Sequence, residues 1–140
     1  MEPQSFPLTL VKVFFTRTMV VAVPEYKTAG VSLTMSPENS IDVKPVDGQQ
    51  GHYAAAMRTM FNKACDPSAP YFIDMECIGI FTAKGAVSAE EAVRDITATA
   101  HGVLYGAIRE AVSWITGRQA FGQLTLGLAI LQPKEPGETR

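Results

Sequence analysis

The sequence predicts an α+β fold, in which a four-stranded antiparallel sheet is followed by one long amphipathic helix packed on one face. Two observations support this class. Segments rich in Val, Ile, Phe, Thr and Met, separated by Pro and Gly turns, fill residues 8–82, whereas helical periodicity appears only over residues 89–116. Because no helix separates the strands, they are expected to form an antiparallel meander.

The first two strands are predicted at residues 8–23 and 40–44. The first contains no Gly or Pro, but the parity of its apolar side chains switches after Leu10. A switch of this kind indicates a bulge, or a strand with both faces partly covered. Pro24 ends the strand, and residues 25–37 form a connection that is too long for a hairpin.

The third and fourth strands are predicted at residues 52–63 and 71–82. The three alanines at positions 54–56 would also suit a helix, so the third strand depends on its context. The fourth strand alternates clearly after a turn-forming segment at residues 66–70. One of its faces carries Tyr71, Ile73, Met75 and Cys77, and the other carries Phe72, Asp74 and Glu76.

The helix at residues 89–116 has start and stop signals. Ser88 and Glu91 have the spacing of a capping box, in which each side chain bonds the other residue's main-chain amide. Gly117 is expected to end the helix in the left-handed conformation. Beyond it, residues 124–130 alternate like a further strand.

Length and composition indicate one globular domain. The chain of 140 residues is 46% hydrophobic and 19% charged, which excludes a disordered protein. Residues 6–131 are expected to form the ordered core and residues 132–140 a loose tail. The charges nearly cancel, with 12 basic and 14 acidic residues, so no nucleic-acid footprint is present.

No targeting or metal-binding pattern is visible. The chain begins Met1-Glu2 without a basic lead-in, so we expect no signal peptide, and no apolar stretch is long enough to span a membrane. Cys65 and Cys77 form no CxxC motif and no ligand cluster with a histidine, which favours reduced thiols in the cytoplasm and no metal site.

Small residues recur beside the apolar stripe of the helix. Ala98, Gly102 and Gly106 lie four apart, and a glycine inside a helix costs about 1 kcal/mol relative to Ala. A close approach by the same helix of another subunit would offset that cost, with Gly102 near the two-fold axis. Tolerated strain is the alternative. The side chains expected to flank this contact are Tyr105, Arg109 and Trp114.

Three segments, in this order, resemble the SecB family of protein-export chaperones. They are Phe15-Thr16-Arg17-Thr18-Met19, the run from Asp74 to Thr82 that contains Gly-Ile-Phe, and Leu104-Tyr105-Gly106-Ala107-Ile108-Arg109-Glu110 continuing through Arg118 to Phe121-Gly122-Gln123-Leu124-Thr125-Leu126. The order of elements also matches the family over residues 6–131.

The resemblance implies a cytoplasmic homotetramer, a dimer of dimers, that holds unfolded or precursor polypeptides without ATP for protein export. The family binds these chains in an apolar groove built from its second and fourth strands and the long connection after the first. The matching positions are Ile41, Val43, Tyr71, Ile73, Met75 and Cys77. Read from the sequence without the resemblance, the same face could simply be core beneath the helix.

Two departures from the family pattern bear on partners. Thr18 and Ala22 replace acidic residues with which the family docks the SecA motor, leaving Phe72, Asp74 and Glu76 of the matching patch, so SecA docking is expected to be weak or absent. The family's C-terminal helix is expected to be shortened or absent here, because residues 132–140 are polar and contain two prolines. A SecB-like chaperone dedicated to one client, such as an antitoxin, is therefore an alternative.

A thioesterase and a carrier of small ligands are the alternatives to a chaperone. The predicted layers resemble those of hot-dog thioesterases, but there the helix comes early, whereas here it is last. His52 and His101 are the only side chains expected to titrate near neutral pH, and His101 is interpreted as a solvated or interface residue. No phosphate-binding Gly loop is present, so we expect no nucleotide cofactor. No motif places a Ser/His/Asp set, so we expect no enzyme. A carrier of small apolar ligands remains open.

Overall fold

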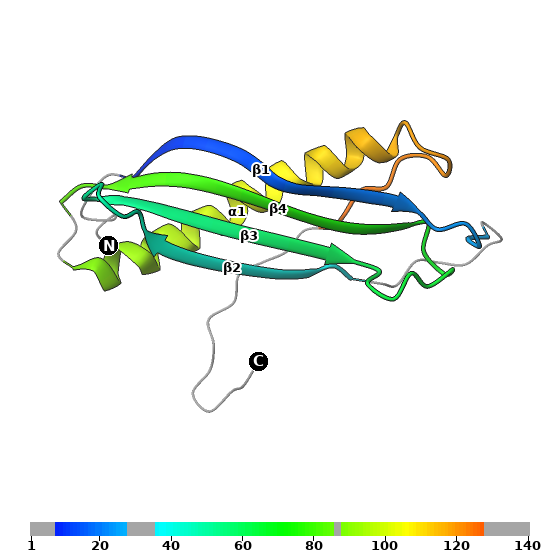
Figure 1. Cartoon of the computed structure of the whole chain (residues 1–140), viewed down its shortest axis with the longest axis horizontal. Helices are drawn as coiled ribbons and strands as arrows, with labels where there is room; N and C mark the ends of the chain where they lie inside the picture. Colours follow the sequence, from blue (N-terminus) through cyan, green and yellow to red (C-terminus); the bar gives the residue numbers. More distant parts are fainter. Residues whose placement is uncertain (1–7, 28–35, 86–87, 128–140) are drawn as a thin grey trace, which may run out of the picture.

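The computed structural model describes residues 8–27, 36–85 and 88–127. These residues form one antiparallel sheet and one helix, as the predicted α+β class requires (Figure 1). The elements are β1 (Leu8–Ala22), β2 (Glu38–Pro45), β3 (His52–Phe61), β4 (Tyr71–Ala83) and α1 (Ala89–Thr116).

The strand order is β1-β4-β3-β2, so the predicted simple meander is wrong for the first strand. Strands β2, β3 and β4 follow one another, but β1 pairs with β4 and not with β2. The connection between β1 and β2 carries the chain from one edge of the sheet to the other, which explains why it is too long for a hairpin. Strands β1 and β2 are therefore the two edge strands of the described sheet.

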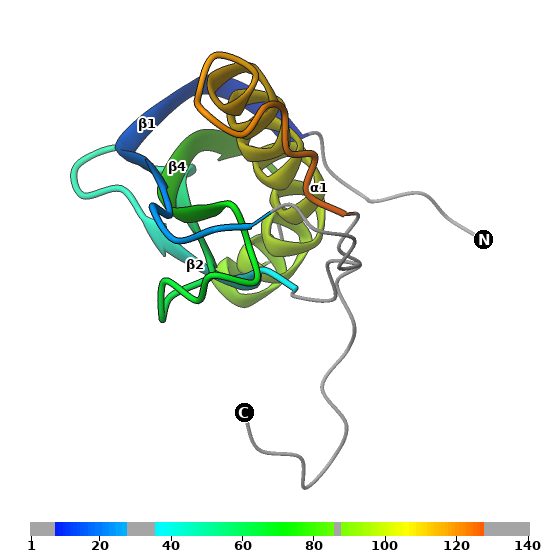
Figure 2. The same ribbon diagram turned by 90° about the vertical axis from the view of Figure 1, so that its right-hand side faces the viewer.

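Helix α1 lies along one face of the sheet and crosses it diagonally, from β2 near its start to β1 near its end (Figures 1 and 2). Its apolar stripe is fully buried, as its three- and four-residue spacing predicts. The stripe consists of Ile96, Ala100, Leu104, Ile108 and Val112. No helix of the described residues is long and apolar enough to cross a membrane.

Strand β1 contains two irregularities in its pairing with β4, which confirms the bulge that its switched parity predicts. They lie between Leu10 and Lys12 and between Phe15 and Arg17. After the second one, Thr18 pairs with Met75, whose side chain is buried under α1. The bulges therefore turn side chains of β1 toward the helix that a regular strand would place on the outer face.

The start of α1 agrees with the prediction, but its end does not. The Ser88 hydroxyl accepts a hydrogen bond from the Glu91 amide at 3.1 Å. Gly117, however, is right-handed, with φ −61°, and its amide continues the helical bonding to the Ser113 carbonyl at 3.1 Å. The chain instead adopts a left-handed conformation at Gly122, where φ is +82°.

Residues 117–127, the return segment, run back along α1 without forming a strand. The Tyr71 hydroxyl donates to the Gly122 carbonyl (2.8 Å) and accepts from the Phe121 amide (3.0 Å). The Tyr105 hydroxyl donates to the Gly127 carbonyl at 2.6 Å. Side-chain hydrogen bonds thus replace the strand predicted at residues 124–130, of which 128–130 lie outside the described residues.

On the outer face of the sheet, Asp74 is 4% exposed and bonded by Arg58, whose Nε and Nη2 atoms donate to its two oxygens at 2.9 and 2.8 Å. These hydrogen bonds hold the pKa of Asp74 below its ordinary value, although burial acts in the opposite direction. The ionised carboxylate therefore stabilises the fold above about pH 4, and this stability is lost as the pH falls through the lowered pKa.

We expect Asp74→Asn to lower the urea midpoint at pH 7. Below about pH 4, the difference in midpoint between the variant and the wild type should shrink progressively. Urea titrations of both proteins between pH 7 and pH 2.5 measure the effect. Asp42→Asn is the matched control, because Asp42 is exposed and its carboxylate lies 3.4 Å from Lys44 Nζ. A difference between Asp74→Asn and wild type that stays constant with pH would contradict the account.

Candidate functional site: an apolar groove between the first strand and the long helix

Large apolar side chains are exposed on two elements of the described structure, and most of them belong to β1. This is unusual for an edge strand, which normally carries charges or prolines that discourage association. The exposed side chains of β1 are Leu10, Val11, Val13, Phe15, Met19 and Val21, and those of α1 are Val103 and Trp114.

A groove of about 470 Å³ lies between β1 and the C-terminal half of α1. Strand β1 contributes Phe15 and Thr18, and the bulge after Phe15 allows both side chains to face the helix. The small side chains of Ala107 and Ala111 leave the space open on the helix side. The complete lining is Phe15, Thr18, Met75, Ala107, Glu110, Ala111, Trp114 and Ile115.

Trp114 is the most exposed aromatic side chain of this groove, at 61%, and Phe15 is 37% exposed. The Arg118 guanidinium stacks 3.8 Å from the centroid of the indole ring and also donates to the Trp114 carbonyl at 3.0 Å. The stacking holds the ring at the groove by a cation–π interaction. An aromatic ring held in place can bury a partner's apolar side chain at little cost in conformational entropy.

The six positions predicted to line a client groove are found mostly in the core. Four of them lie under α1 and are 0–1% exposed: Tyr71, Ile73, Met75 and Cys77. This agrees with the interpretation of this face as core beneath the helix, which was made without the family resemblance. Ile41 and Val43 on β2 are half-buried and pack against the same core. Of the six, only Met75 borders the open groove. Burial also raises the pKa of the Cys77 thiol to about 11, so this sulfur is unreactive at neutral pH.

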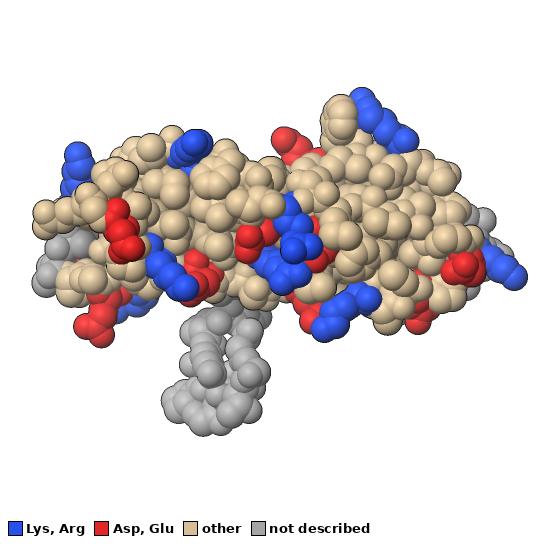
Figure 3. Space-filling model, viewed as in Figure 1, with Lys and Arg blue, Asp and Glu red and all other residues tan. Residues whose placement is uncertain are grey.

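The residues of the predicted motor-docking patch lie on the outer face, where charges of both signs gather at the centre (Figure 3). Phe72 and Glu76 are half-buried, and the Thr16 hydroxyl donates to Glu76 Oε1 at 2.5 Å. Asp74 is buried and paired with Arg58. Thr18 and Ala22 face the helix, so they do not belong to the same surface as Asp74.

The small residues predicted to form the assembly surface are exposed, but some of the side chains predicted to flank them are not. Ala98, Gly102 and Gly106 lie on the solvent side of α1, and a Cβ atom added at either glycine would meet nothing within 4 Å. Two of the flanking side chains bond the return segment instead: Tyr105 is buried, and Arg109 Nε donates to the Leu126 carbonyl at 2.7 Å. The third, Trp114, lines the groove.

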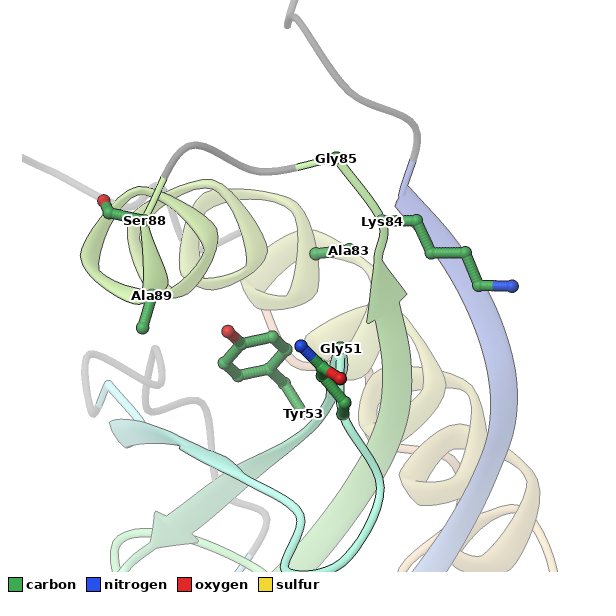
Figure 4. Close-up of a pocket in the computed structure, with 8 residues that line it drawn as sticks. Gly51, Tyr53, Ala83, Lys84, Gly85, Ser88 and Ala89 are labelled. Carbon is green, nitrogen blue, oxygen red and sulfur yellow. The ribbon is translucent and has the colours of Figure 1, made fainter.

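A second hollow of about 470 Å³, more polar, lies at the start of α1 and is lined by Gln50, Gly51, Tyr53, Ala83, Lys84, Gly85, Ser88 and Ala89. Figure 4 shows the Tyr53 hydroxyl directed toward the first turn of the helix and the Lys84 side chain pointing away from it. Glu90 and Glu91 already place negative charge on this positive helix end, so the hollow does not attract an anion.

Among the described residues, no group of three or more His, Cys, Asp and Glu side chains could hold a metal ion. His101 is 8% exposed, so it is not the solvated residue of the first interpretation, and its alternative role at an interface stays a prediction. Burial lowers its pKa. Its ring packs 6.5 Å from that of Tyr105. The sequence contains one signal of the groove, the parity switch of β1, but this switch predicts only a bulge and not that Phe15 and Trp114 lie beside the same open space.

Similarity to known proteins is found among solved structures. No protein-family profile and no curated protein sequence matches the chain. Among solved structures, it is similar to the SecB-like chaperone of Mycobacterium tuberculosis in complex with a ChAD peptide from the HigA1 antitoxin, with a TM-score of 0.69, 20% identity and coverage of 87% of this chain and 90% of that one. It is also similar to a protein of unknown function from Streptococcus agalactiae (TM-score 0.54, 11% identity, coverage of 89% and 100%). The chain therefore has the fold of a SecB-like chaperone.

Proposed function

We propose that this protein is a SecB-like chaperone of the cytoplasm, which holds unfolded polypeptides without ATP and without catalysis. The observation that carries the proposal is the open apolar groove between β1 and α1, bordered by Phe15 and Trp114. A groove bordered by partly exposed aromatic rings can take up the apolar side chains of a partner. The exposed aromatic rings suit partners of unlike sequence, because they bury apolar side chains of different shapes.

A client dedicated to this chaperone fits the structure better than a general export role. An export role of the SecB type requires carboxylates that a motor protein can reach, but Asp74 is buried and already bonded by Arg58. The structurally similar mycobacterial chaperone holds a peptide from an antitoxin. We therefore propose one principal polypeptide client, of the antitoxin class, and no functional docking to SecA.

The test of the proposed function is suppression of aggregation. A chemically denatured protein is diluted into buffer with and without the chaperone, and light scattering is recorded. The proposal predicts that scattering is delayed at stoichiometric chaperone concentrations and in the absence of ATP. Scattering that is unchanged for several unrelated denatured proteins, an antitoxin among them, would contradict it.

The proposal includes assembly into a homotetramer through α1. The exposed row of Ala98, Gly102 and Gly106 allows another helix to approach closely. Because Gly102 points to open space, Gly102→Leu is accommodated within the chain and is expected to block that approach. We predict that this variant is dimeric by size-exclusion chromatography with light scattering, with helix content by circular dichroism nearly unchanged.

Thr99→Leu is the control for this prediction. It places a new leucine at an exposed position of the same helix, one residue after Ala98 and therefore off the line of small residues. We expect this variant to keep the mass of the wild type. A Gly102→Leu protein that remains tetrameric at low micromolar concentration would show that the row is not the assembly surface.

A further inference from the structure

Four side chains of the sheet and the helix bond the main chain of the return segment. The Tyr71 hydroxyl contacts the amide of residue 121 and the carbonyl of residue 122, at 3.0 and 2.8 Å. Thr116 Oγ1 accepts from the amide of residue 124 at 2.8 Å. Arg109 Nε donates to the carbonyl of residue 126 at 2.7 Å, and the Tyr105 hydroxyl donates to that of residue 127 at 2.6 Å. These four side chains, the polar track, therefore recognise an extended main chain whatever its side chains are.

Three apolar side chains of the return segment point inward between these bonds. Phe121 lies between two rings, with its centroid 5.0 Å from that of Tyr26 and 6.0 Å from that of Tyr71. Leu124 packs against the core, and Leu126 is only 2% exposed. The residues between them, at positions 122, 123 and 125, are exposed. The segment thus presents an aromatic residue followed by leucines three and five positions later.

The return segment belongs neither to the sheet nor to α1. All four strands pair without it, so its departure leaves every strand pair in place (Figures 1 and 2). It also contains Gln119 Oε1, the one buried side-chain nitrogen or oxygen of the described residues that makes no hydrogen bond. A buried acceptor without a donor carries an energetic cost, which ends when the side chain reaches water. The polar track can therefore be vacated without unfolding the protein.

We infer that the return segment is a built-in substitute for the client and shows which clients bind. This inference rests on the proposed function and specifies its client class: polypeptides in which an aromatic residue is followed by leucines at the third and fifth positions. Such a segment displaces the return segment, makes the same main-chain hydrogen bonds and places its apolar side chains where Phe121, Leu124 and Leu126 lie. The return segment and the client therefore compete for one site.

The polar track is continuous with the apolar groove. A hollow of about 470 Å³ at the end of α1 is lined in part by Gln123 together with Glu110 and Trp114, and the latter two also line the groove. A single extended chain therefore reaches both, with apolar side chains in the groove beside Trp114 and its following residues on the track. The track adds main-chain hydrogen bonds to the apolar contacts of the groove.

The first experiment supplies the segment as a separate peptide. The probe is a fluorescein-labelled peptide with the sequence of residues 119–127, and its anisotropy is followed during titration with the full-length protein. Leu124→Ser combined with Leu126→Ser weakens the competing segment, so we expect this variant to bind the probe at least about tenfold more tightly than the wild type. Thr125→Ser combined with Gly127→Ser is the matched control, because both positions are exposed, and it should bind as the wild type does. A probe with serine at its aromatic and leucine positions should not bind the variant.

The second experiment locks the segment in place. A Cβ atom at Gly117 would lie 3.9 Å from that of Gln123, close to the separation of about 3.8 Å in disulfides. Its tightest contact is 3.3 Å to the Ser113 carbonyl oxygen, which a small shift relieves. Gly117→Cys with Gln123→Cys therefore closes the turn that holds Phe121. Cys65→Ser removes the exposed native thiol from this background. The oxidised protein should bind the probe at least about tenfold more weakly than the same protein after reduction.

The outcomes separate this inference from the proposed function. Equal binding of the probe by the oxidised and reduced proteins, in a protein that suppresses aggregation, overturns the inference and leaves the proposed function standing. Failure of the probe to bind, in a protein that also fails to suppress aggregation, overturns both. Probe binding that lowers the mass of the assembly in light scattering would mean that the track holds the return segment of a second copy, which overturns the inference alone. Because the locked protein is its own control, a serine variant that does not fold leaves this test in force.

Discussion

Replacing Phe15 and Trp114 together by serine is expected to weaken binding of an unfolded client by at least about thirtyfold. These two rings are the most exposed aromatic side chains that line the groove. Removing about 100 Å² of apolar contact costs about 2 kcal/mol or more. Since both side chains are partly exposed in the unoccupied protein, the variant should remain folded. Fluorescence anisotropy of a labelled apolar peptide measures the loss.

The matched control is Val103→Ser combined with Val21→Ser. Both valines are exposed, on α1 and β1 respectively, but neither lines the groove. The control therefore removes apolar surface from the same two elements and should bind nearly as wild type. Equal losses in the two double variants would show that general surface hydrophobicity, and not this groove, holds the client.

A buried charge beneath the helix is expected to abolish folding. Ile73 is 0% exposed and lies on the face of β4 that packs against α1. The sequence-based interpretation of this position as an open groove predicts that Ile73→Asp stays folded, whereas its burial predicts the reverse. Placing a carboxylate there without a partner costs several kcal/mol, comparable to the whole stability of a small domain. We expect Ile73→Asp to lack a cooperative urea transition.

Ile73→Val provides the comparison, because it removes one methyl group and should cost only about 1 kcal/mol. Far-ultraviolet circular dichroism during urea titration checks both variants. A cooperative transition of Ile73→Asp near the wild-type midpoint would contradict the burial of this face. It would indicate instead that α1 leaves the sheet readily enough to expose Ile73.

The elements could be predicted from the sequence because their signals are local. The spacing of apolar residues and the Ser88–Glu91 cap set the limits of α1, and alternation defines β4 with both of its faces. The parity switch in β1 predicted a bulge, which the pairing with β4 contains. Each of these features depends on neighbours within a few positions along the chain.

The strand order and the site could not be predicted in the same way. Pairing of β1 with β4 depends on contacts between residues about 60 positions apart, which no local pattern reports. The conformation of Gly117 was missed for a similar reason, because the Tyr71 hydroxyl, far away in sequence, fixes the turn that follows.

The groove residues show the limit of position matching. A strand face is apolar both when it belongs to the core and when it lines an open groove. The residue types at Tyr71, Ile73 and Cys77 therefore do not distinguish the two environments. The distinction comes from where α1 lies across the sheet. Because the helix runs diagonally toward β1, it covers these side chains and leaves the space beside Phe15 and Trp114 open.

The most direct test of the central claim uses the intrinsic fluorescence of the protein. Trp114 is the single tryptophan of the chain and lies at the groove, so its emission reports on this site alone. Titration with a tryptophan-free, unfolded client should shift the emission to shorter wavelength and saturate at the concentration at which the client's own anisotropy saturates, because the ring moves from water to an apolar contact. Saturable client binding that leaves the emission of Trp114 unchanged would contradict the account.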